Sequence, residues 1–211
     1  MFKDREEAGR LLAKELLPYK SSNQIVVALP RGGVIPAFEI AKALNAPLDI
    51  FFVKKIPSPY NKEAAIGAIS ENGYYFVDKA AKNMLNISDS YIQNAMEEVL
   101  QNIKEKREIY NKPRVNYKDK EIILVDDGVA TGSSMLLAID ALKKEGAKKV
   151  IVASPVAPIE VANRLKEKAD GALFLETPSI FNAVGEFYKD FHQLSDNEVL
   201  EILKKDSNLN L

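Results

Sequence analysis

The sequence predicts an α/β protein in which helices cover both faces of a parallel sheet. Short β-branched runs alternate along the chain with helical patterns, which is the arrangement typical of parallel sheets. These runs are apolar throughout, as expected of strands that are buried on both faces. At 211 residues the chain has the length of one α/β domain, so we expect a single domain over residues 1–211.

The first element is expected to be a helix over about residues 4–18. Asp4 is suited to cap this helix, and leucines recur at helical spacing up to Pro18. The next elements follow from apolar runs and turn residues: a buried strand at 25–29, a glycine turn at 30–33, a helix at 34–44 and a second buried strand at 48–53.

A polar stretch with two prolines, residues 54–65, is expected to be a loop. Two short strands, 66–69 and 74–77, flank Glu71-Asn72-Gly73, which has the composition of a hairpin turn. A long helix over 88–110 follows, and its mixed run Lys104 to Arg107 is interpreted as solvated helix surface.

The second half of the chain continues the alternation of strands and helices. We expect a strand at 121–125, a helix at 134–145 closed by Gly146, a strand at 150–153, a helix at 159–168, a strand at 172–175 and a last helix at 195–205. Residues 177–192 are rich in aromatic side chains and lack periodicity, so they form either a lid or a packed brace.

Composition excludes several classes of function. The net charge of −1 and the absence of a basic face argue against a nucleic-acid partner. The chain has no cysteine, which excludes disulfides and thiolate chemistry, and its single histidine, His192, argues against a histidine metal site or a catalytic triad. We see no targeting segment and no stretch of membrane-spanning length, so we expect a cytoplasmic protein with no membrane partner.

The strongest candidate site begins where the strand at 121–125 ends. Two carboxylates, Asp126 and Asp127, precede a loop of small residues that opens a helix. Backbone N–H groups in such a loop, together with the helix N-terminus, favour a phosphate, and Thr131, Ser133 and Ser134 add hydroxyl donors. The paired carboxylates are suited to accept hydrogen bonds from vicinal hydroxyls or to hold a magnesium-bound ligand.

Residues 122–134 resemble the phosphoribosyl diphosphate (PRPP) binding signature of type I phosphoribosyltransferases. That signature is an apolar strand, two acidic residues and a small-residue loop that ends Thr-Gly-x-Thr/Ser. The resemblance implies that Asp126 and Asp127 bind the ribose hydroxyls. The residues it implies for the 5-phosphate are Gly128, Val129, Ala130, Thr131, Gly132, Ser133 and Ser134.

The turn at the end of the first strand resembles the pyrophosphate loop of the same family. Its glycines expose backbone N–H groups, and Arg31 adds a cation. The residues that the resemblance implies for pyrophosphate are Pro30, Arg31, Gly32, Gly33 and Lys54. The resemblance also makes Lys55 and Glu63 catalytic candidates, with Glu71 as an alternative to Glu63 for the loop carboxylate that adenine enzymes of the family use as a proton donor.

The resemblance extends over nearly the whole chain, to an uncharacterised bacterial and archaeal branch of predicted phosphoribosyltransferases. It implies a type I phosphoribosyltransferase-like sheet, a flexible hairpin and loop cover over about 54–73, and a C-terminal aromatic hood or brace over about 177–211. Phe181 and Phe187 are the candidates for stacking on the acceptor. Analogy with the family also implies a homodimer.

The implied function is transfer of phosphoribose from PRPP, with Mg²⁺, to a nitrogen acceptor such as a nucleobase, with release of pyrophosphate. Mg²⁺ would be held through PRPP, with Asp126 and Asp127 as candidate ligands. Ala130 stands where hypoxanthine-guanine enzymes place an aspartate, so the acceptor stays open. The alternative is a non-catalytic PRPP-binding regulator on the same fold.

Overall fold

The protein is described by a computed structural model that covers residues 1–61 and 64–209. Its elements follow one another in this order: α1 (Arg5–Leu16), a 3₁₀ turn (Leu17–Tyr19), β1 (Gln24–Ala28), α2 (Val34–Leu44), β2 (Leu48–Ile50), β3 (Val53–Pro57), β4 (Ala65–Ser70), β5 (Tyr75–Val77), α3 (Lys79–Met84), α4 (Asp89–Ile109), β6 (Glu121–Val125), α5 (Ser133–Lys144), β7 (Lys149–Val156), α6 (Ile159–Lys168), β8 (Gly171–Glu176), a second 3₁₀ turn (Val184–Phe187) and α7 (Asp196–Leu209).

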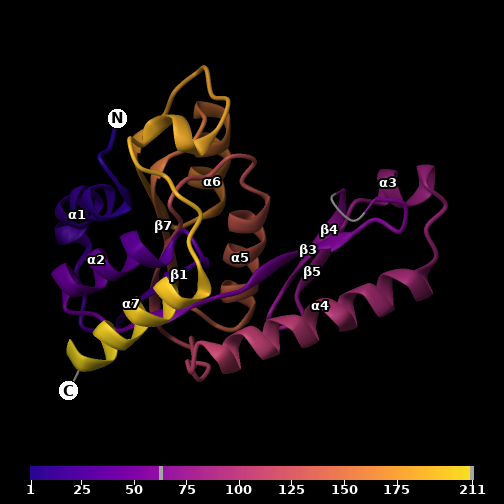
Figure 1. Cartoon of the computed structure of the whole chain (residues 1–211), viewed down its shortest axis with the longest axis horizontal. Coiled ribbons are helices and arrows are strands. Elements are labelled where there is room, and N and C mark those ends of the chain that lie inside the picture. Colours follow the sequence, from indigo (N-terminus) through magenta and orange to yellow (C-terminus); the bar gives the residue numbers. More distant parts are fainter. Residues whose placement is uncertain (62–63, 210–211) are drawn as a thin grey trace.

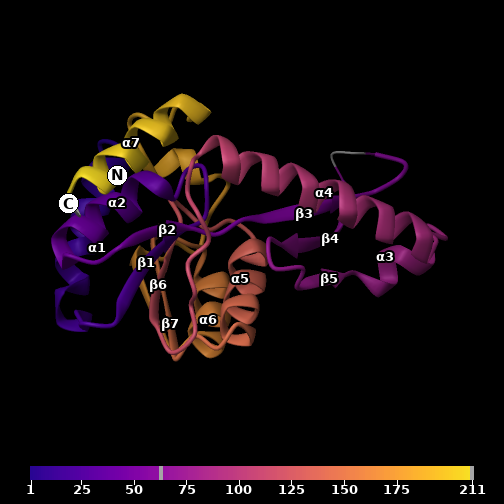
Figure 2. The same ribbon diagram turned by 90° about the horizontal axis from the view of Figure 1, so that it is seen from below.

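The main body is built on a five-stranded parallel sheet in the order β2-β1-β6-β7-β8. Helices α1, α2 and α7 lie on one face of this sheet, and α5 and α6 lie on the other (Figures 1 and 2). The predicted α/β class, with a parallel sheet covered on both faces, is therefore confirmed.

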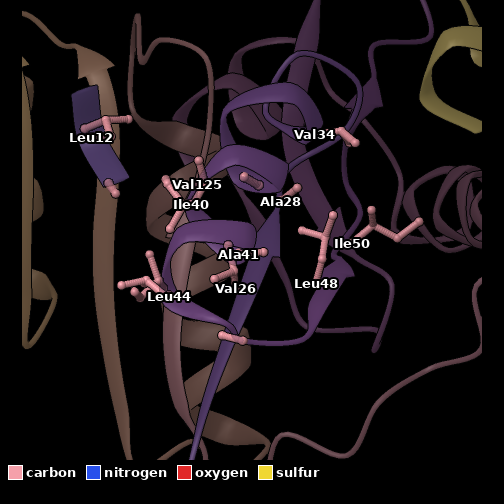
Figure 3. Packing of buried hydrophobic residues seen from close by; sticks show 14 of the residues in the cluster. Leu12, Val26, Ala28, Val34, Ile40, Ala41, Leu44, Leu48, Ile50 and Val125 are labelled. Atoms are coloured by element: carbon pink, nitrogen blue, oxygen red, sulfur yellow. The ribbon is translucent and has the colours of Figure 1, made fainter. Parts of the chain in front are cut away.

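The central strands of this sheet contribute side chains to two separate cores, because successive side chains point to opposite faces. On β6, Ile123 and Val125 join the core beneath α1 and α2, whereas Ile122 and Leu124 join the core beneath α5 and α6. Figure 3 shows the first of these cores, where the apolar side of α2 packs onto β1. This double burial explains why the strand is apolar from Ile122 to Val125.

The three short strands β3, β4 and β5 form a second, antiparallel sheet in that order. Together with α3 and α4 it makes an arm that projects from the main body (Figure 1). A core of its own lies between the sheet and α4, formed by Ile56, Ile66, Ile69, Ile87, Ile92, Ala95 and Met96.

The expected loop at 54–65 is wrong for its first residues, because β3 covers Val53–Pro57 and pairs with β4. Lys54, Lys55 and Pro57 do not favour a strand, so the sequence pattern did not predict β3. They are tolerated because β3 is an edge strand, where Lys and Pro are common, and Pro57 lies at a register shift. The expected hairpin between β4 and β5 is confirmed.

The short helix α3 was not expected. Asp78 caps it by accepting hydrogen bonds from the N–H groups of Ala80 and Ala81, at 2.8 and 3.1 Å. Its six residues are too few to show a periodic apolar face, which is why the pattern missed it.

The C-terminal segment acts as a brace against the N-terminus. Phe2 forms a parallel bridge with Tyr188, and the two rings pack with centroids 5.4 Å apart. Ser195 and Glu198 then cap α7 reciprocally, as the sequence predicted for a last capped helix. Within the described residues, no helix combines the length with the apolar content that crossing a membrane requires.

Candidate functional site

The two predicted loops meet at the carboxyl edge of the parallel sheet. Strands β1 and β6 are neighbours, and Ala28 lies opposite Val125 at the last register position. The turn after β1 presses so closely on the turn after β6 that a Cβ added at Gly32 would lie 2.1 Å from Oδ2 of Asp127. Only glycine fits this approach, so the sequence feature that suggested an exposed backbone also allows the two loops to touch.

Both turns open helices that have a glycine at the N-cap position, Gly33 for α2 and Gly132 for α5. Because glycine has no side chain, neither helix has a side-chain cap. In α2 the N–H of Val34 donates to the carbonyl of Arg31 at 3.1 Å and Pro36 has no N–H, whereas in α5 the N–H of Ser133 has only a long contact, 3.5 Å, with Oγ1 of Thr131. The helix dipoles add partial positive charge at the same edge of the sheet. This arrangement favours two anionic groups side by side.

Thr131, in the loop before α5, and Ser133 and Ser134, in the first turn of α5, are exposed, as a phosphate-binding role requires. Val129 does not fit the predicted set, because its side chain is buried in the core and its N–H donates to the carbonyl of Val156 at 2.9 Å. We therefore assign Val129 to packing, and expect the other residues of 128–134 to hold the phosphate.

The adjacent carboxylates Asp126 and Asp127 have different surroundings. Asp127 is buried and accepts a hydrogen bond from Nε of Arg5 at 2.6 Å, while its backbone carbonyl accepts one from the hydroxyl of Tyr188 at 2.5 Å. Asp126 is partly exposed, and its Oδ1 accepts a bond from the N–H of Asp127 at 2.9 Å. Asp126 is thus the more exposed residue of the pair, whereas the carboxylate of Asp127 lies between Gly32 and Arg5.

The electrostatics of the pair follow from this geometry. Burial, and next the negative charge of Asp127, raise the pKa of Asp126 well above its ordinary value, although Arg5 opposes the shift. Its ionised form therefore lacks sufficient positive compensation from the chain. A hydroxyl donor or a cation bound at the carboxylate of Asp126 would stabilise the ionised form.

Arg5 was not among the predicted site residues. Its guanidinium stacks over the ring of Phe191 at 3.9 Å and its Nη1 donates to the carbonyl of His192 at 2.9 Å, in addition to the bond to Asp127. Arg5 lies in the first turn of α1, where a cation is unfavourable because it opposes the helix dipole. This unfavourable position was the one feature of the sequence that could have marked Arg5 as a site residue. Its partner lies 122 positions away.

A cleft of about 690 Å³ lies between β3, α4 and Ser134 at the start of α5. Its walls include Lys54, Lys55, Lys106 and Ser134. The structure therefore brings the predicted lysines of β3 to the same cleft as the phosphate loop, and it adds Lys106. Burial, and next the nearby cations Arg31 and Lys106, lower the pKa of Lys54, which indicates that these positive groups converge.

The predicted loop carboxylates are not confirmed as proton donors. Glu63 lies outside the described residues. Glu71 is buried and pairs with Nη2 of Arg107 at 2.8 Å, while its Oε2 accepts the N–H of Phe52 at 3.0 Å, so it serves the fold.

The interpretation of Lys104 to Arg107 as solvated surface is wrong for Arg107, whose side chain is 10% exposed. Arg107 also lies 3.4 Å from the fully buried Asp49, which accepts a hydrogen bond from the hydroxyl of Tyr117 at 2.6 Å. The acidic partners of Arg107 are Asp49, in β2, and Glu71, in the turn after β4. Both are distant in sequence, so no local pattern predicts these pairs.

The two predicted acceptor-binding rings, Phe181 and Phe187, stack on each other with centroids 5.6 Å apart and an interplanar angle of 17°. Both are partly buried. They lie near the phosphate loop, because a Cβ added at Gly128 would meet Val184, from the 3₁₀ turn that also contains Phe187. A flat acceptor would have to use an outer face of this stacked pair.

Among the described residues no group of three or more histidine or acidic side chains is arranged to hold a metal ion. The partly exposed Asp126 offers one carboxylate, and Arg5 already occupies Asp127. This donor set fits Mg²⁺ that takes most of its ligands from a phosphorylated substrate and from water, which is its usual mode of binding.

Comparison with known proteins agrees with this geometry. Residues 3–192 match the family model described as phosphoribosyl transferase domain. The chain is 35% identical over 207 residues to a protein of Mycobacterium tuberculosis, Rv0571c, whose name gives phosphoribosyl transfer as its assumed activity. The match covers 97% of this chain but 47% of the relative, so the chain spans about half the length of that protein.

The crystal structure of TT1426 from Thermus thermophilus is similar over almost its whole length. It shares 38% identity, covers 97% of this chain and 98% of its own, and superposes with a TM-score of 0.81. A third relative is the ribose-phosphate pyrophosphokinase of Pyrococcus furiosus, which is 28% identical over 168 residues, or 71% of this chain and 60% of its own.

Proposed function

The chain belongs to the phosphoribosyl transferase domain family, and from this premise we propose that it transfers the phosphoribosyl group of PRPP to a nitrogen acceptor. The observation that carries the proposal is the meeting of two glycine-capped helix N-termini beside the partly exposed Asp126. PRPP has the matching chemistry, since it joins a 5-phosphate and a diphosphate through a ribose with two free hydroxyls.

In this proposal the 5-phosphate lies at the start of α5, held by N–H groups and by the hydroxyls of Thr131, Ser133 and Ser134. Asp126 accepts hydrogen bonds from the ribose hydroxyls. Asp127 holds the loop in place through Arg5. The diphosphate lies against residues 30–33, with Arg31 and Lys54 as its cations and Lys55 beside them in the cleft.

The reaction forms one bond and breaks one bond at the anomeric carbon. The lone pair of the acceptor nitrogen forms the new bond, while the bond to the pyrophosphate oxygen breaks and its electron pair leaves with pyrophosphate. Negative charge therefore grows on the leaving group, where Arg31 and Lys54 stabilise it. When bound, Mg²⁺ supplies further positive charge to the diphosphate.

For the acceptor we propose a nitrogenous base, placed against the outer face of the pair Phe181 and Phe187. Proton transfer during the reaction is assigned to Glu63, because Glu71 is engaged by Arg107. The homodimer expected from the family and the cytoplasmic location stay predictions.

The test is release of pyrophosphate from PRPP and Mg²⁺ with a panel of nucleobases, orotate and simple amines. We expect one class of nitrogen acceptor to give pyrophosphate in step with the phosphoribosylated product. Asp126→Asn should abolish this release, whereas Lys104→Met, an exposed change on α4, should leave it unchanged. PRPP binding without release for any acceptor would favour the regulator, and absence of both would contradict the proposal.

A further inference from the structure

A group of cations surrounds one carboxylate next to Lys106, which lines the cleft. Asp196, at the start of α7, pairs through Oδ2 with Nζ of Lys106, and its Oδ1 accepts a hydrogen bond from the hydroxyl of Tyr110 at 2.7 Å. Nη1 of Arg31 lies 3.9 Å from the same Oδ1. We call Arg31, Lys54, Lys106, Tyr110 and Asp196 the Asp196 cluster.

The Asp196 cluster brings together four parts of the chain. Arg31 belongs to the loop after β1, Lys54 to β3, Lys106 and Tyr110 to the end of α4, and Asp196 to α7. Figure 1 shows α4 returning from the arm so that its last turns lie beside the start of α7. The cluster is therefore placed where the arm, the main body and the C-terminal helix meet.

Positive charge exceeds negative charge in this cluster. Burial lowers the pKa of Lys54, and the positive charges of Arg31 and Lys106 lower it further, against the smaller opposite effect of Asp196. Hydrogen bonds from Lys106 and Tyr110 lower the pKa of Asp196, so this carboxylate stays ionised. Within the cluster one carboxylate faces three cations, and Glu98 and Glu105 line the same cleft.

The donors around Asp196 have the geometry of an anion site. They present an ammonium, a phenol hydroxyl and a guanidinium to the two oxygens of one carboxylate. A terminal phosphate offers oxygens of the same kind with a larger negative charge, so it competes for the same donors. Arg31 and Lys54 were already expected at the diphosphate, and Lys106 lines the same cleft as Ser134.

We propose that Lys106 is a third cation of the pyrophosphate subsite, and that Asp196 is a resident counter-ion which an incoming diphosphate displaces. The proposal rests on the function proposed above. It assigns a binding role to the end of α4 and a competing role to the start of α7. Both residues are about one-third exposed, so a ligand reaches them without unfolding of either helix.

The test is calorimetric titration of inorganic pyrophosphate, with Mg²⁺, into the wild-type chain and three variants. Lys106→Met should weaken binding about tenfold or more, because a charge-assisted bond is lost. Asp196→Asn should tighten binding several-fold, because the competing charge is removed. Lys104→Met, on the same helix but outside the cluster, should bind like the wild type.

The outcomes distinguish a carboxylate of Asp196 that competes with the ligand from one that only docks α7. If Asp196 only docks α7, Asp196→Asn lowers the midpoint of thermal unfolding and leaves the affinity for pyrophosphate unchanged, and this result overturns the inference. The inference also fails if Lys106→Met binds like Lys104→Met. A wild-type chain that binds neither pyrophosphate nor PRPP overturns the proposed function itself, and with it this inference.

Discussion

At the scale of single residues, Asp126 and Asp127 show how neighbours of the same type acquire different tasks. The sequence predicts the pair and its place at the end of a strand, because strand, acids and small loop are contiguous. It does not predict that Arg5 engages Asp127, since that contact is fixed by the packing of α1 and of the C-terminal brace. A double substitution of both aspartates would therefore disturb the fold, and Asp126 is the cleaner target.

Asp126→Asn should stabilise the chain at neutral pH while it removes PRPP binding. Because the pKa of Asp126 is raised on folding, its charge opposes folding above that pKa, and the stability it contributes falls as pH rises from its ordinary value of 3.8 through the raised value. Asn keeps the acceptor for the N–H of Asp127 without the charge. We expect the unfolding midpoint to rise by a few degrees, at roughly 2–4 °C per kcal/mol.

The measurement is thermal unfolding of both proteins from pH 4 to pH 8. The gain should shrink towards acid pH, where Asp126 of the wild type is protonated in the folded chain. An equal gain at every pH, or a loss of stability at neutral pH, would show that the charge of Asp126 is compensated.

At the scale of elements, the α5 N-terminus is the part of the site that the sequence defines best. Gly132 has φ of 78°, a left-handed conformation that glycine adopts without strain, and a Cβ there would lie 2.8 Å from the side chain of Val161. The Thr-Gly-Ser pattern thus has a conformational cause as well as a chemical one.

Gly132→Ala should cost about 1–2 kcal/mol of stability and should also weaken PRPP binding. Gly73→Ala is the matched control, because Gly73 has φ of 81° in the hairpin turn with open space around it. Chemical denaturation should show both losses of stability, and calorimetry should show weaker PRPP binding for Gly132→Ala alone. Equal PRPP affinities of the two variants would show that the turn at Gly132 does not bind the phosphate.

The arm is the element that the sequence predicts least well. Its hairpin is visible in the turn composition, whereas β3 contains Lys54, Lys55 and Pro57, which do not favour a strand. The contact that anchors the arm to the main body is also not evident from the sequence. Arg107 joins Glu71 and Asp49 across elements that are distant in sequence, although the local run of charges is typical of solvated surface.

Arg107→Met should destabilise the chain by about 3 kcal/mol or more, because the buried Asp49 would lose the cation beside it and Glu71 would keep only Arg114, at 3.4 Å. Lys104→Met, from the same run, should change the free energy of unfolding by less than about 0.5 kcal/mol. Urea denaturation measures both. The double variant Glu71→Gln with Arg107→Met should lose less than the sum of the single changes, and strict additivity would argue against a direct pair.

At the scale of the whole molecule, the site is made by segments that folding brings together from most of the chain. The order β2-β1-β6-β7-β8 places the ends of β1 and β6 side by side, which the two motifs alone do not specify. The α/β class and the covered parallel sheet follow from apolar runs and alternation. The anchor of the arm, the Arg5 contact and the Asp196 cluster depend on distant pairs, so they appear only in the structure.

The central claim is that the edge shared by β1 and β6 is a PRPP site centred on Asp126. Calorimetric titration of PRPP with Mg²⁺ into the wild-type chain and into Asp126→Asn tests it most directly. The account predicts one PRPP site per wild-type chain and loss of measurable binding in the variant, with circular dichroism unchanged. Absence of binding to the wild type, or equal affinity of the folded variant, would contradict it.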